Sequence, residues 1–392
     1  MLIMINELAE KFHRIYHEPA SNVFFAPGRV NLIGEHTDYN GGHVFPCAIT
    51  QGTYGLISPR KDSEIHCLSL NFEELGIQSF SVDGPLSYQR SAGWLNYVKG
   101  VVKYIQEQVG EQSLGFNLLV YGNIPNGAGL SSSASLELLI GVILRSLNGF
   151  DIRQLDLIKI GQKVENQFIG LKSGIMDQFA IGMGQKDQAL FLDVNTLDYQ
   201  LVPADFGEYV ILIMNTNKRR ELETSKYNER RSQCEEGLKK LQSELAIQTL
   251  GDLDAQTFES YRYLIDDPIL EARAKHAVYE NERTIKAMEV LQNNDLETFG
   301  KLLNQSHTSL RDDYDVTGLE LDTLVESAWS QEGVLGARMT GAGMGGCAIA
   351  LVHQAKVDEI SEQIATHYQA VVGYSPSFYI AEIGDGAREL EM

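Results

Sequence analysis

Residues 26–42, APGRVNLIGEHTDYNGG, form the stretch of the sequence that is richest in potential chemistry. It places several hydrogen-bonding side chains between glycines, among them Arg29, Glu35, His36 and Asp38. Carboxylates accept hydrogen bonds from hydroxyls, and histidine can donate or accept. Such a set suits a polyol ligand, because a site built to pair with hydroxyls rejects analogues that leave its polar groups unpaired. A polar surface loop explains the same residues and stays open as an alternative.

A second stretch, residues 122–135, is rich in glycine and serine: GNIPNGAGLSSSAS. A strand-like segment precedes it, and an apolar, helix-like segment, LELLIGVIL, follows it. Small residues let backbone N–H groups approach an anion, and the positive end of the helix dipole adds to the attraction. Serine hydroxyls in this position can cap the helix, bind phosphate or ligate magnesium. The pattern favours a phosphate site over a simple capped helix.

Two further stretches are ambiguous when taken alone. Residues 340–347, TGAGMGGC, supply glycines for positive φ angles or for close approach of a ligand, and a tight β-turn is the simpler interpretation. Glu165 lies within an expected helix, where a solvated side chain is the default. Asp177 lies at the start of a short expected helix, where an aspartate ordinarily caps the backbone.

Some short patterns match known motifs but fail on their context. Gly341, Gly343 and Gly346 fit the dinucleotide-binding fingerprint, yet the apolar strand CAIALV follows them rather than a helix. The DFG at residues 205–207 matches the magnesium motif of protein kinases, but no HRD precedes it and the glycine loop follows it. The sequence contains neither a P-loop nor a GxSxG elbow.

Composition and charge narrow the class of protein. The chain has 392 residues, of which 43% are hydrophobic and 22% are charged, as in a globular protein of two or three domains. Its 53 acidic and 32 basic residues give a formal net charge of −21, which disfavours general binding to nucleic acids or anionic membranes. The 4 cysteines form no CxxC pair, and we find neither a signal peptide nor a membrane span. We therefore expect a cytoplasmic protein with reduced thiols.

The order of expected elements predicts an α+β fold of two domains. Helices are expected at residues 6–16, 94–109, 131–147, 151–168 and through most of 225–305. Strands are expected at residues 23–26, 116–122, 190–193, 209–214 and 378–383, and a loop running into a strand at 337–352. The character of the sequence changes near residues 203–208, so we expect domains at 1–205 and 206–392.

Together, these stretches resemble the galactokinases, a family within the GHMP superfamily of small-molecule kinases. GRVNLIGEHTDYNGG is the segment that distinguishes galactokinases from mevalonate and homoserine kinases. The ATP loop of the superfamily appears as PNGAGLSSSAS and its third motif as MTGAGMGGCA, and GIMDQFA and SKYNERR also look like galactokinase segments. The motifs run from residue 26 to residue 347, so the resemblance spans nearly the whole chain.

The resemblance implies a fold and an activity. The N-terminal domain would be related to the second domain of ribosomal protein S5, and a ferredoxin-like C-terminal domain would pack against it, with the active site in the cleft between them. The implied reaction is ATP-dependent phosphorylation of the C1 hydroxyl of α-D-galactose to galactose 1-phosphate, with ADP as the other product, which is the first committed step of galactose catabolism. ATP and Mg²⁺ are the implied cofactors. No nucleic acid, membrane or obligate protein partner is expected.

The resemblance also implies roles for single residues. Asp177 would face the C1 hydroxyl as catalytic base, and Arg29 would lie between Asp177 and the γ-phosphate. The galactose pocket would be formed by Glu35, His36, Thr37, Asp38, Gly174 and Tyr227. The ATP phosphates would be wrapped by Gly127, Ala128, Gly129, Leu130, Ser131, Ser132 and Ser133. Magnesium would be held by Ser133 and Glu165, and the segments near the nucleotide would include Ser69 and Trp94.

Four alternatives stay open on the sequence. An N-acetylgalactosamine kinase would differ only in the room around C2 of the sugar. A galactose-sensing regulator without catalysis is disfavoured, because the Ser133-Ala134 pair of the ATP loop is intact. Asp177 either removes the hydroxyl proton or only aligns the hydroxyl, since a loose transition state needs little activation of the nucleophile. The basic run of residues 218–220 either approaches phosphate or faces solvent.

Overall fold

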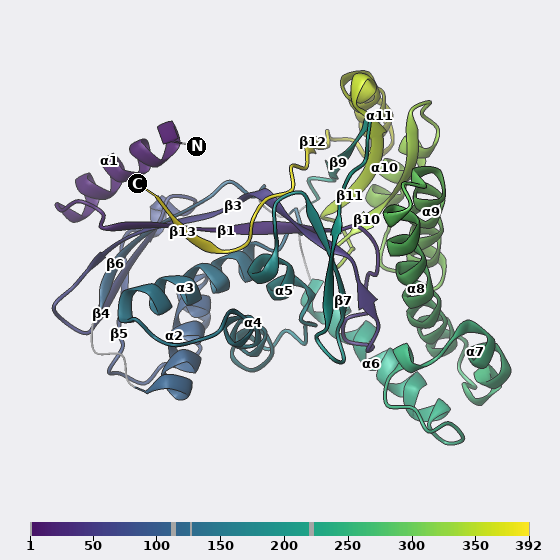
Figure 1. Cartoon of the computed structure of the whole chain (residues 1–392), viewed down its shortest axis with the longest axis horizontal. Coiled ribbons are helices and arrows are strands. Elements are labelled where there is room, and N and C mark those ends of the chain that lie inside the picture. The colour runs from purple at the N-terminus through teal and green to yellow at the C-terminus, as the bar shows by residue number, and fades with distance from the viewer. Residues whose placement is uncertain (1, 111–114, 126–127, 219–222, 392) are drawn as a thin grey trace.

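The computed structural model describes residues 2–110, 115–125, 128–218 and 223–391 (Figure 1). Its α-helices are α1 (Leu2–Tyr16), α2 (Leu95–Val109), α3 (Ser132–Asn148), α4 (Gln154–Lys163), α5 (Met176–Met183), α6 (Glu223–Leu241), α7 (Ala255–Tyr261), α8 (Pro268–Gln292), α9 (Leu296–Asp312), α10 (Leu319–Trp329) and α11 (Val357–Val372). Its strands are β1 (Asn22–Asn31), β2 (His43–Val44), β3 (Pro46–Pro59), β4 (Glu64–Ser69), β5 (Gln78–Ser81), β6 (Phe116–Gly122), β7 (Gln188–Asp193), β8 (Tyr199–Pro203), β9 (Tyr209–Asn215), β10 (Val334–Thr340), β11 (Cys347–His353), β12 (Ser377–Ile380) and β13 (Arg388–Leu390).

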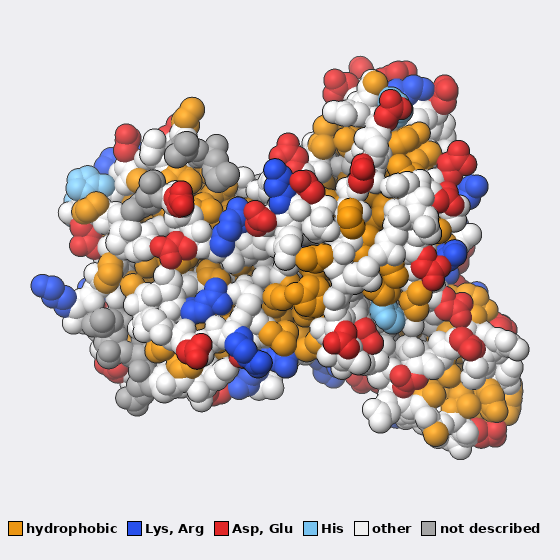
Figure 2. Space-filling view, viewed as in Figure 1, with side chains coloured by type: hydrophobic (Ala, Val, Ile, Leu, Met, Phe, Trp, Pro, Cys, Tyr) orange, Lys and Arg blue, Asp and Glu red, His pale blue; other side chains and the backbone are white. Residues whose placement is uncertain are grey.

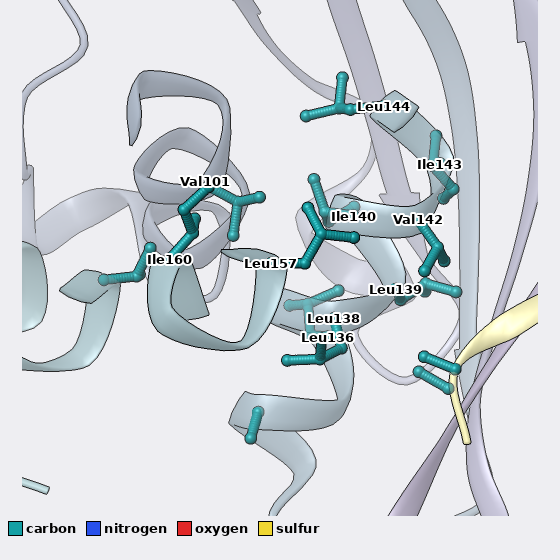
Figure 3. Packing of buried hydrophobic residues seen from close by; sticks show 14 of the residues in the cluster. Val101, Leu136, Leu138, Leu139, Ile140, Val142, Ile143, Leu144, Leu157 and Ile160 are labelled. Atoms are coloured by element: carbon teal, nitrogen blue, oxygen red, sulfur yellow. The ribbon is translucent and has the colours of Figure 1, made fainter. Parts of the chain in front are cut away.

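A six-stranded sheet in the order β13-β1-β3-β6-β4-β5 forms the first half of the molecule. Helices α2 to α5 lie on one side of it (Figure 1). The segment LELLIGVIL makes α3 apolar around most of its circumference, so this helix is buried between the sheet and the neighbouring helices. Figure 3 shows Ile140 of this helix beside Leu157 of α4 and near Val101 of α2. Gly149 ends α3 in the left-handed conformation, with a φ of 63°.

The opposite side of this sheet is covered by α1. The amphipathic spacing of Leu8 and Phe12 turns one face of that helix toward apolar side chains of β1 and β3. Side chains alternate between the two faces of a strand, so β1 and β3 contribute to cores on both sides of the sheet. The sheet is therefore a buried, rigid layer from which the loop after β1 projects.

A four-stranded antiparallel sheet in the order β10-β11-β9-β12 forms the second half. In chain order this is 2-3-1-4, with helices between the first and second and between the third and fourth strands, which is the ferredoxin-like arrangement. One face of the sheet packs on α8, α9, α10 and α11. The other face carries Ile213 and Ile349, which join a core shared with Val30 and Phe45 of the first half. The two halves are thus joined by buried apolar contacts.

The C-terminal end of the chain crosses back to the first half. β13 pairs antiparallel with β1, through Val23 with Leu390 and Phe25 with Arg388. Figure 1 shows this yellow segment returning alongside β1. Residues 388–390 therefore extend the first sheet, although the expected division at residue 205 grouped them with the second domain. A small sheet in the order β2-β7-β8 lies beside the junction.

Two expected elements differ from the structure in an informative way. The helix expected at 151–168 is α4 followed by a π-helical turn, η3 (Val164–Ile169), which has wider backbone spacing and includes Glu165. The loop-to-strand segment expected at 337–352 holds two strands, β10 and β11, with residues 341–346 as the turn between them. The strand β11 follows those glycines, whereas a dinucleotide-binding fingerprint requires a helix there. The structure therefore agrees with the exclusion of that motif from the sequence.

The surface reflects the negative net charge. In Figure 2, acidic side chains are spread over the part that contains α8 to α11. Across the described ranges, none of the helices has the length and hydropathy that crossing a bilayer requires.

Candidate active site

A cavity of about 320 Å³ lies where the loop after β1, the glycine-serine loop before α3, the η3–α5 segment and α6 meet. Many residues singled out in the sequence line it, although they come from segments far apart in the chain. These are Arg29, Glu35, His36, Asp38, Ala128, Gly129, Leu130, Ser131, Ser132, Ser133, Glu165, Gly174, Asp177 and Tyr227. The fold therefore combines the hydroxyl-binding stretch and the phosphate-binding stretch in one site.

Three other expected site residues are not among those that line the cavity, and a fourth lies outside the described residues. Thr37 is fully buried, and its hydroxyl lies 2.8 Å from the carbonyl oxygen of Gly34 and 2.6 Å from that of His43, which share its one proton, so it holds the loop in shape. Ser69 is buried at the end of β4, where its hydroxyl oxygen accepts from a backbone N–H. Trp94 packs against the core under the first sheet. Gly127 lies outside the described residues.

Asp177 and Arg29 form the central charged pair of the cavity. Asp177 lies in the first turn of α5. Arg29 donates from Nε to Oδ1 at 2.8 Å and from Nη2 to Oδ2 at 3.0 Å, which is a bidentate pairing. Its third nitrogen, Nη1, donates to the carbonyl oxygen of Gly129 at 2.7 Å. The guanidinium is nearly buried, so it links the carboxylate rigidly to the glycine-serine loop.

A second carboxylate of the cavity, Glu165, lies next to the glycine-serine loop. The side chain is 3% exposed, and its Oε1 accepts a hydrogen bond from the Ser133 hydroxyl at 2.9 Å. Ser173 donates to the other oxygen. Burial, together with the nearby Asp177, raises the pKa of Glu165. No arginine or lysine within the described part of the chain forms an ion pair with it, and this hard oxygen set fits a small divalent cation.

The loop after β1 is fastened to the second half of the molecule through Glu35. This carboxylate is 1% exposed and accepts from Asn31 Nδ2 at 2.9 Å and from the Gly341 N–H at 2.6 Å. Arg338 of β10 lies 3.4 Å from it and is fully buried. The glycines around residue 341 adopt positive φ angles, which turn this N–H toward the carboxylate. The third glycine-rich motif is therefore a structural turn that also lines the cavity.

Sequence reasoning did not single out several residues that shape this site. Arg338 was read only as part of a loop before a strand, yet it contacts the loop that bears Glu35. Behind His36, Tyr39 and Tyr314 form a buried chain in which Nδ1 of the imidazole lies 2.7 Å from the Tyr39 hydroxyl. Burial, and the proximity of another histidine, lower the pKa of His36 to about 3, so the imidazole is neutral. A lone tyrosine in a sequence gives no signal of such a contact.

The basic run at residues 218–220 is only partly described. Lys218 Nζ lies 3.0 Å from Glu320 Oε2, so this lysine forms an ion pair within the second half of the molecule. Arg219 and Arg220 lie outside the described residues.

Comparisons with protein families define the class of protein. Residues 96–185 match the GHMP kinases N terminal domain, and residues 287–370 match the GHMP kinases C terminal domain. A crystal structure of mevalonate kinase, 19% identical, superposes with a TM-score of 0.64 over 93% of this chain and 100% of that chain, which shows the shared fold. The chain is a two-domain kinase of the GHMP superfamily, and the predicted α+β fold class is confirmed.

More similar proteins identify the family within that superfamily. Residues 10–59 match the galactokinase galactose-binding signature. Galactokinase of Ligilactobacillus salivarius is 57% identical over 97% of this chain and 98% of its own length, and that of Staphylococcus carnosus is 53% identical over 99% and 100%. The structure of Lactococcus lactis galactokinase complexed with galactose has a TM-score of 0.97 and 50% identity, over 99% of this chain and 100% of that chain. The chain belongs to the galactokinase family, and the predicted family and enzyme class are confirmed.

Asp38, which lines the cavity, packs closely against Gly174. Asp38 accepts from the Met176 N–H at 3.5 Å, and burial together with Asp177 raises its pKa to about 7. A Cβ atom built on Gly174 would overlap the Asp38 carboxylate. We expect Gly174→Ala to raise the KM for the sugar on the order of 100-fold, because overpacking displaces Asp38. Steady-state kinetics against sugar and nucleotide measure this.

The matched control is Gly84→Ala, because a Cβ atom at Gly84 would meet neighbours only at 3.6 Å or beyond. This variant should retain both KM values. An unchanged sugar KM in Gly174→Ala would show that Asp38 does not depend on the space that the glycine leaves.

Proposed function

We propose that this chain transfers the γ-phosphoryl group of ATP to the C1 hydroxyl of α-D-galactose, which yields galactose 1-phosphate and ADP and begins the breakdown of galactose. The observation that carries the proposal is the Asp177–Arg29 pair, because it lies between the hydroxyl-binding loop and the glycine-serine loop in one cavity. Phosphoryl transfer depends mainly on positioning and on neutralising charge, and this pair supplies both.

In this reaction Asp177 accepts the hydrogen bond of the C1 hydroxyl and takes its proton as the new O–P bond forms. The bidentate Arg29 fixes the carboxylate in place and offsets the charge that develops on the transferred phosphoryl group. The sugar is held by Glu35, His36, Asp38, Gly174 and Tyr227, which line the same cavity. Thr37 acts indirectly, because it shapes the loop that carries these residues.

The ATP phosphates lie against the loop of residues 128–133 and the N-terminus of α3. That helix has no side-chain cap, so its first N–H groups are open to an anion. Gly127, outside the described residues, belongs to the same motif in the sequence.

Mg²⁺ would be held by Glu165 and Ser133, and when bound it would neutralise phosphate charge. We expect Glu165→Gln to raise the magnesium requirement at least about tenfold, because the substitution removes the only charged ligand of the two. Titration of activity with Mg²⁺ at fixed ATP measures this, and calorimetry of MgADP binding gives a readout that is independent of turnover.

The matched control for this prediction is Glu137→Gln. Glu137 is a buried carboxyl on α3 whose pKa is raised well above its usual value by burial and by Glu165, and it accepts a hydrogen bond from Gln178 rather than from a serine of the glycine-serine loop. Identical magnesium titrations for Glu165→Gln and the unmodified protein would exclude Glu165 as a ligand.

We place the domain boundary between residues 205 and 206, with the sugar- and ATP-binding part before it. In support, β8 ends at Pro203 in one sheet and β9 begins at Tyr209 in another. We also propose a cytoplasmic location, where thiols stay reduced, because all four cysteines are buried.

The experiment that tests the function is ADP release with MgATP and a panel of acceptors: galactose, N-acetylgalactosamine, glucose, mevalonate and homoserine. Turnover confined to galactose supports the proposal. Preference for N-acetylgalactosamine would assign a different hexose to the same site. Galactose binding without any turnover would point to a sensor rather than an enzyme.

A further inference from the structure

Ser131 occupies an unusual position at the start of α3. It is the N-cap residue of the helix, with a φ of 63° and a ψ of 49°, in the left-handed region. An N-cap serine ordinarily has an extended backbone, and its oxygen accepts a hydrogen bond from an N–H of the first turn. Here the side chain makes no capping hydrogen bond. A left-handed conformation is unfavourable for a residue other than glycine, so the surrounding structure enforces it.

The hydroxyl that is withheld from the helix is directed to Asp177. Ser131 Oγ donates to Oδ2 of the carboxylate, the same oxygen that accepts from Arg29 Nη2. Ser131 is 8% exposed, so little water competes for this hydroxyl. The carboxylate is therefore held from two directions, by the guanidinium of β1 and by the loop before α3.

The loop that carries Ser131 is fastened to the same arginine. Arg29 donates from Nη1 to the carbonyl oxygen of Gly129 at 2.7 Å, and its backbone N–H donates to the carbonyl oxygen of Leu130 at 3.1 Å. The two residues that precede Ser131, Gly129 and Leu130, are thus fixed relative to Arg29. Arg29, Ser131 and Asp177 form a closed set of contacts, and a displacement of the loop would move the carboxylate.

We propose that Ser131 is a positioning residue for Asp177 rather than a phosphate ligand, and that its left-handed backbone serves to aim the hydroxyl at the carboxylate. This inference rests on the proposed function, because it assigns Asp177 the sugar hydroxyl. The same conformation leaves the first N–H groups of α3 uncapped, so one residue both orients the base and keeps the helix N-terminus free for the nucleotide.

The test compares substitutions that separate the hydroxyl from the backbone conformation. Ser131→Gly removes the hydroxyl but adopts positive φ without strain, and Ser131→Ala removes the hydroxyl and keeps the strain. Loss of a hydrogen bond to a charged group corresponds to a tenfold to hundredfold effect on rate. We therefore expect kcat to fall by this factor in both variants. The KM for ATP should change little. Ser131→Thr retains the hydroxyl and should retain the larger part of kcat.

A double-mutant cycle supplies the decisive measurement. In an Asp177→Asn background, Ser131→Gly should change the residual kcat by less than about twofold, because the two residues act as one unit. Ser146→Ala is the control, since this serine also donates to a carboxylate, Glu389, but on the exposed end of α3. Its kinetic constants should match those of the unmodified protein.

Two results would overturn the inference. Full activity in Ser131→Gly would show that only the backbone conformation matters, and a rise in the KM for ATP at constant kcat would make Ser131 a phosphate ligand. Failure of the proposed function is separate, because it would appear as absent galactose turnover in the unmodified protein before any variant is compared.

Discussion

Asp177→Asn is expected to lower kcat on the order of 1000-fold while galactose still binds. Asparagine has nearly the same shape as aspartate, so the cavity keeps its form. The amide cannot take a proton from the sugar hydroxyl, and a positioned acid or base is worth 10² to 10⁴ in rate. The substitution also replaces one of the two oxygens that accept from Arg29 with an amide nitrogen, so the bidentate pairing is lost inside a nearly buried site.

Two measurements separate this effect from misfolding. Calorimetry with galactose should give a dissociation constant within a few fold of the unmodified protein, and single-turnover kinetics should show the loss in the chemical step. Asp156→Asn is the matched control, because Asp156 also forms a bidentate pair, with Arg153 at 2.9 Å for both contacts, but at the solvent-exposed start of α4. A near-normal kcat in Asp177→Asn would remove this carboxylate from the mechanism.

Helices and strands were predicted well where a continuous apolar segment of the sequence defines them. The strand at Phe116–Gly122 has the expected bounds, and α3 begins and ends within one residue of the expected helix. In both cases a long apolar segment is bounded by glycine or proline. The π-helical turn around Glu165 was not expected, because a widened helix has the same apolar periodicity over one turn as an ordinary one.

Prediction of the site required knowledge of which distant segments of the chain come together. The residues alone indicated a hydroxyl-binding loop and a phosphate-binding loop, but nothing local places Asp177 beside Arg29, 148 positions away. The resemblance to galactokinases supplied that pairing. It also assigned Thr37 to the sugar, whereas the structure turns this hydroxyl back onto its own loop. Whether a side chain in a turn points inward or outward depends on backbone angles that composition does not encode.

Arg338 illustrates the part that no sequence pattern reveals. A buried arginine in an apolar strand has no local signature, since its partners come from other segments of the chain. Its Nη1 donates to the carbonyl oxygens of Asn31 and Leu32, at 3.0 and 3.2 Å, and its Nε donates to the Ser306 hydroxyl at 3.1 Å. It therefore joins α9 and β10 to the loop that carries Glu35.

Arg338→Met is expected to lower the free energy of unfolding by about 3–5 kcal/mol. Methionine fills a similar volume, so the loss comes from charge rather than from a cavity. Removing one partner of a buried pair leaves the other charge uncompensated, and Glu35 is only 1% exposed. Glu280 is affected as well: burial raises its pKa, but Arg283, His276 and Arg338 outweigh burial and lower it to about 2. Two buried carboxylates therefore lose a shared cation.

Equilibrium unfolding in urea, followed by tyrosine fluorescence and far-ultraviolet circular dichroism, measures the loss. Arg311→Met is the matched control, because Arg311 also pairs with carboxylates, Asp312 and Glu326 at 2.8 Å, but on the protein surface. Exposed pairs are worth about 0–1 kcal/mol, so this variant should unfold close to the unmodified protein. Equal losses in the two variants would mean that burial of the Arg338 charge contributes nothing specific to the free energy of unfolding.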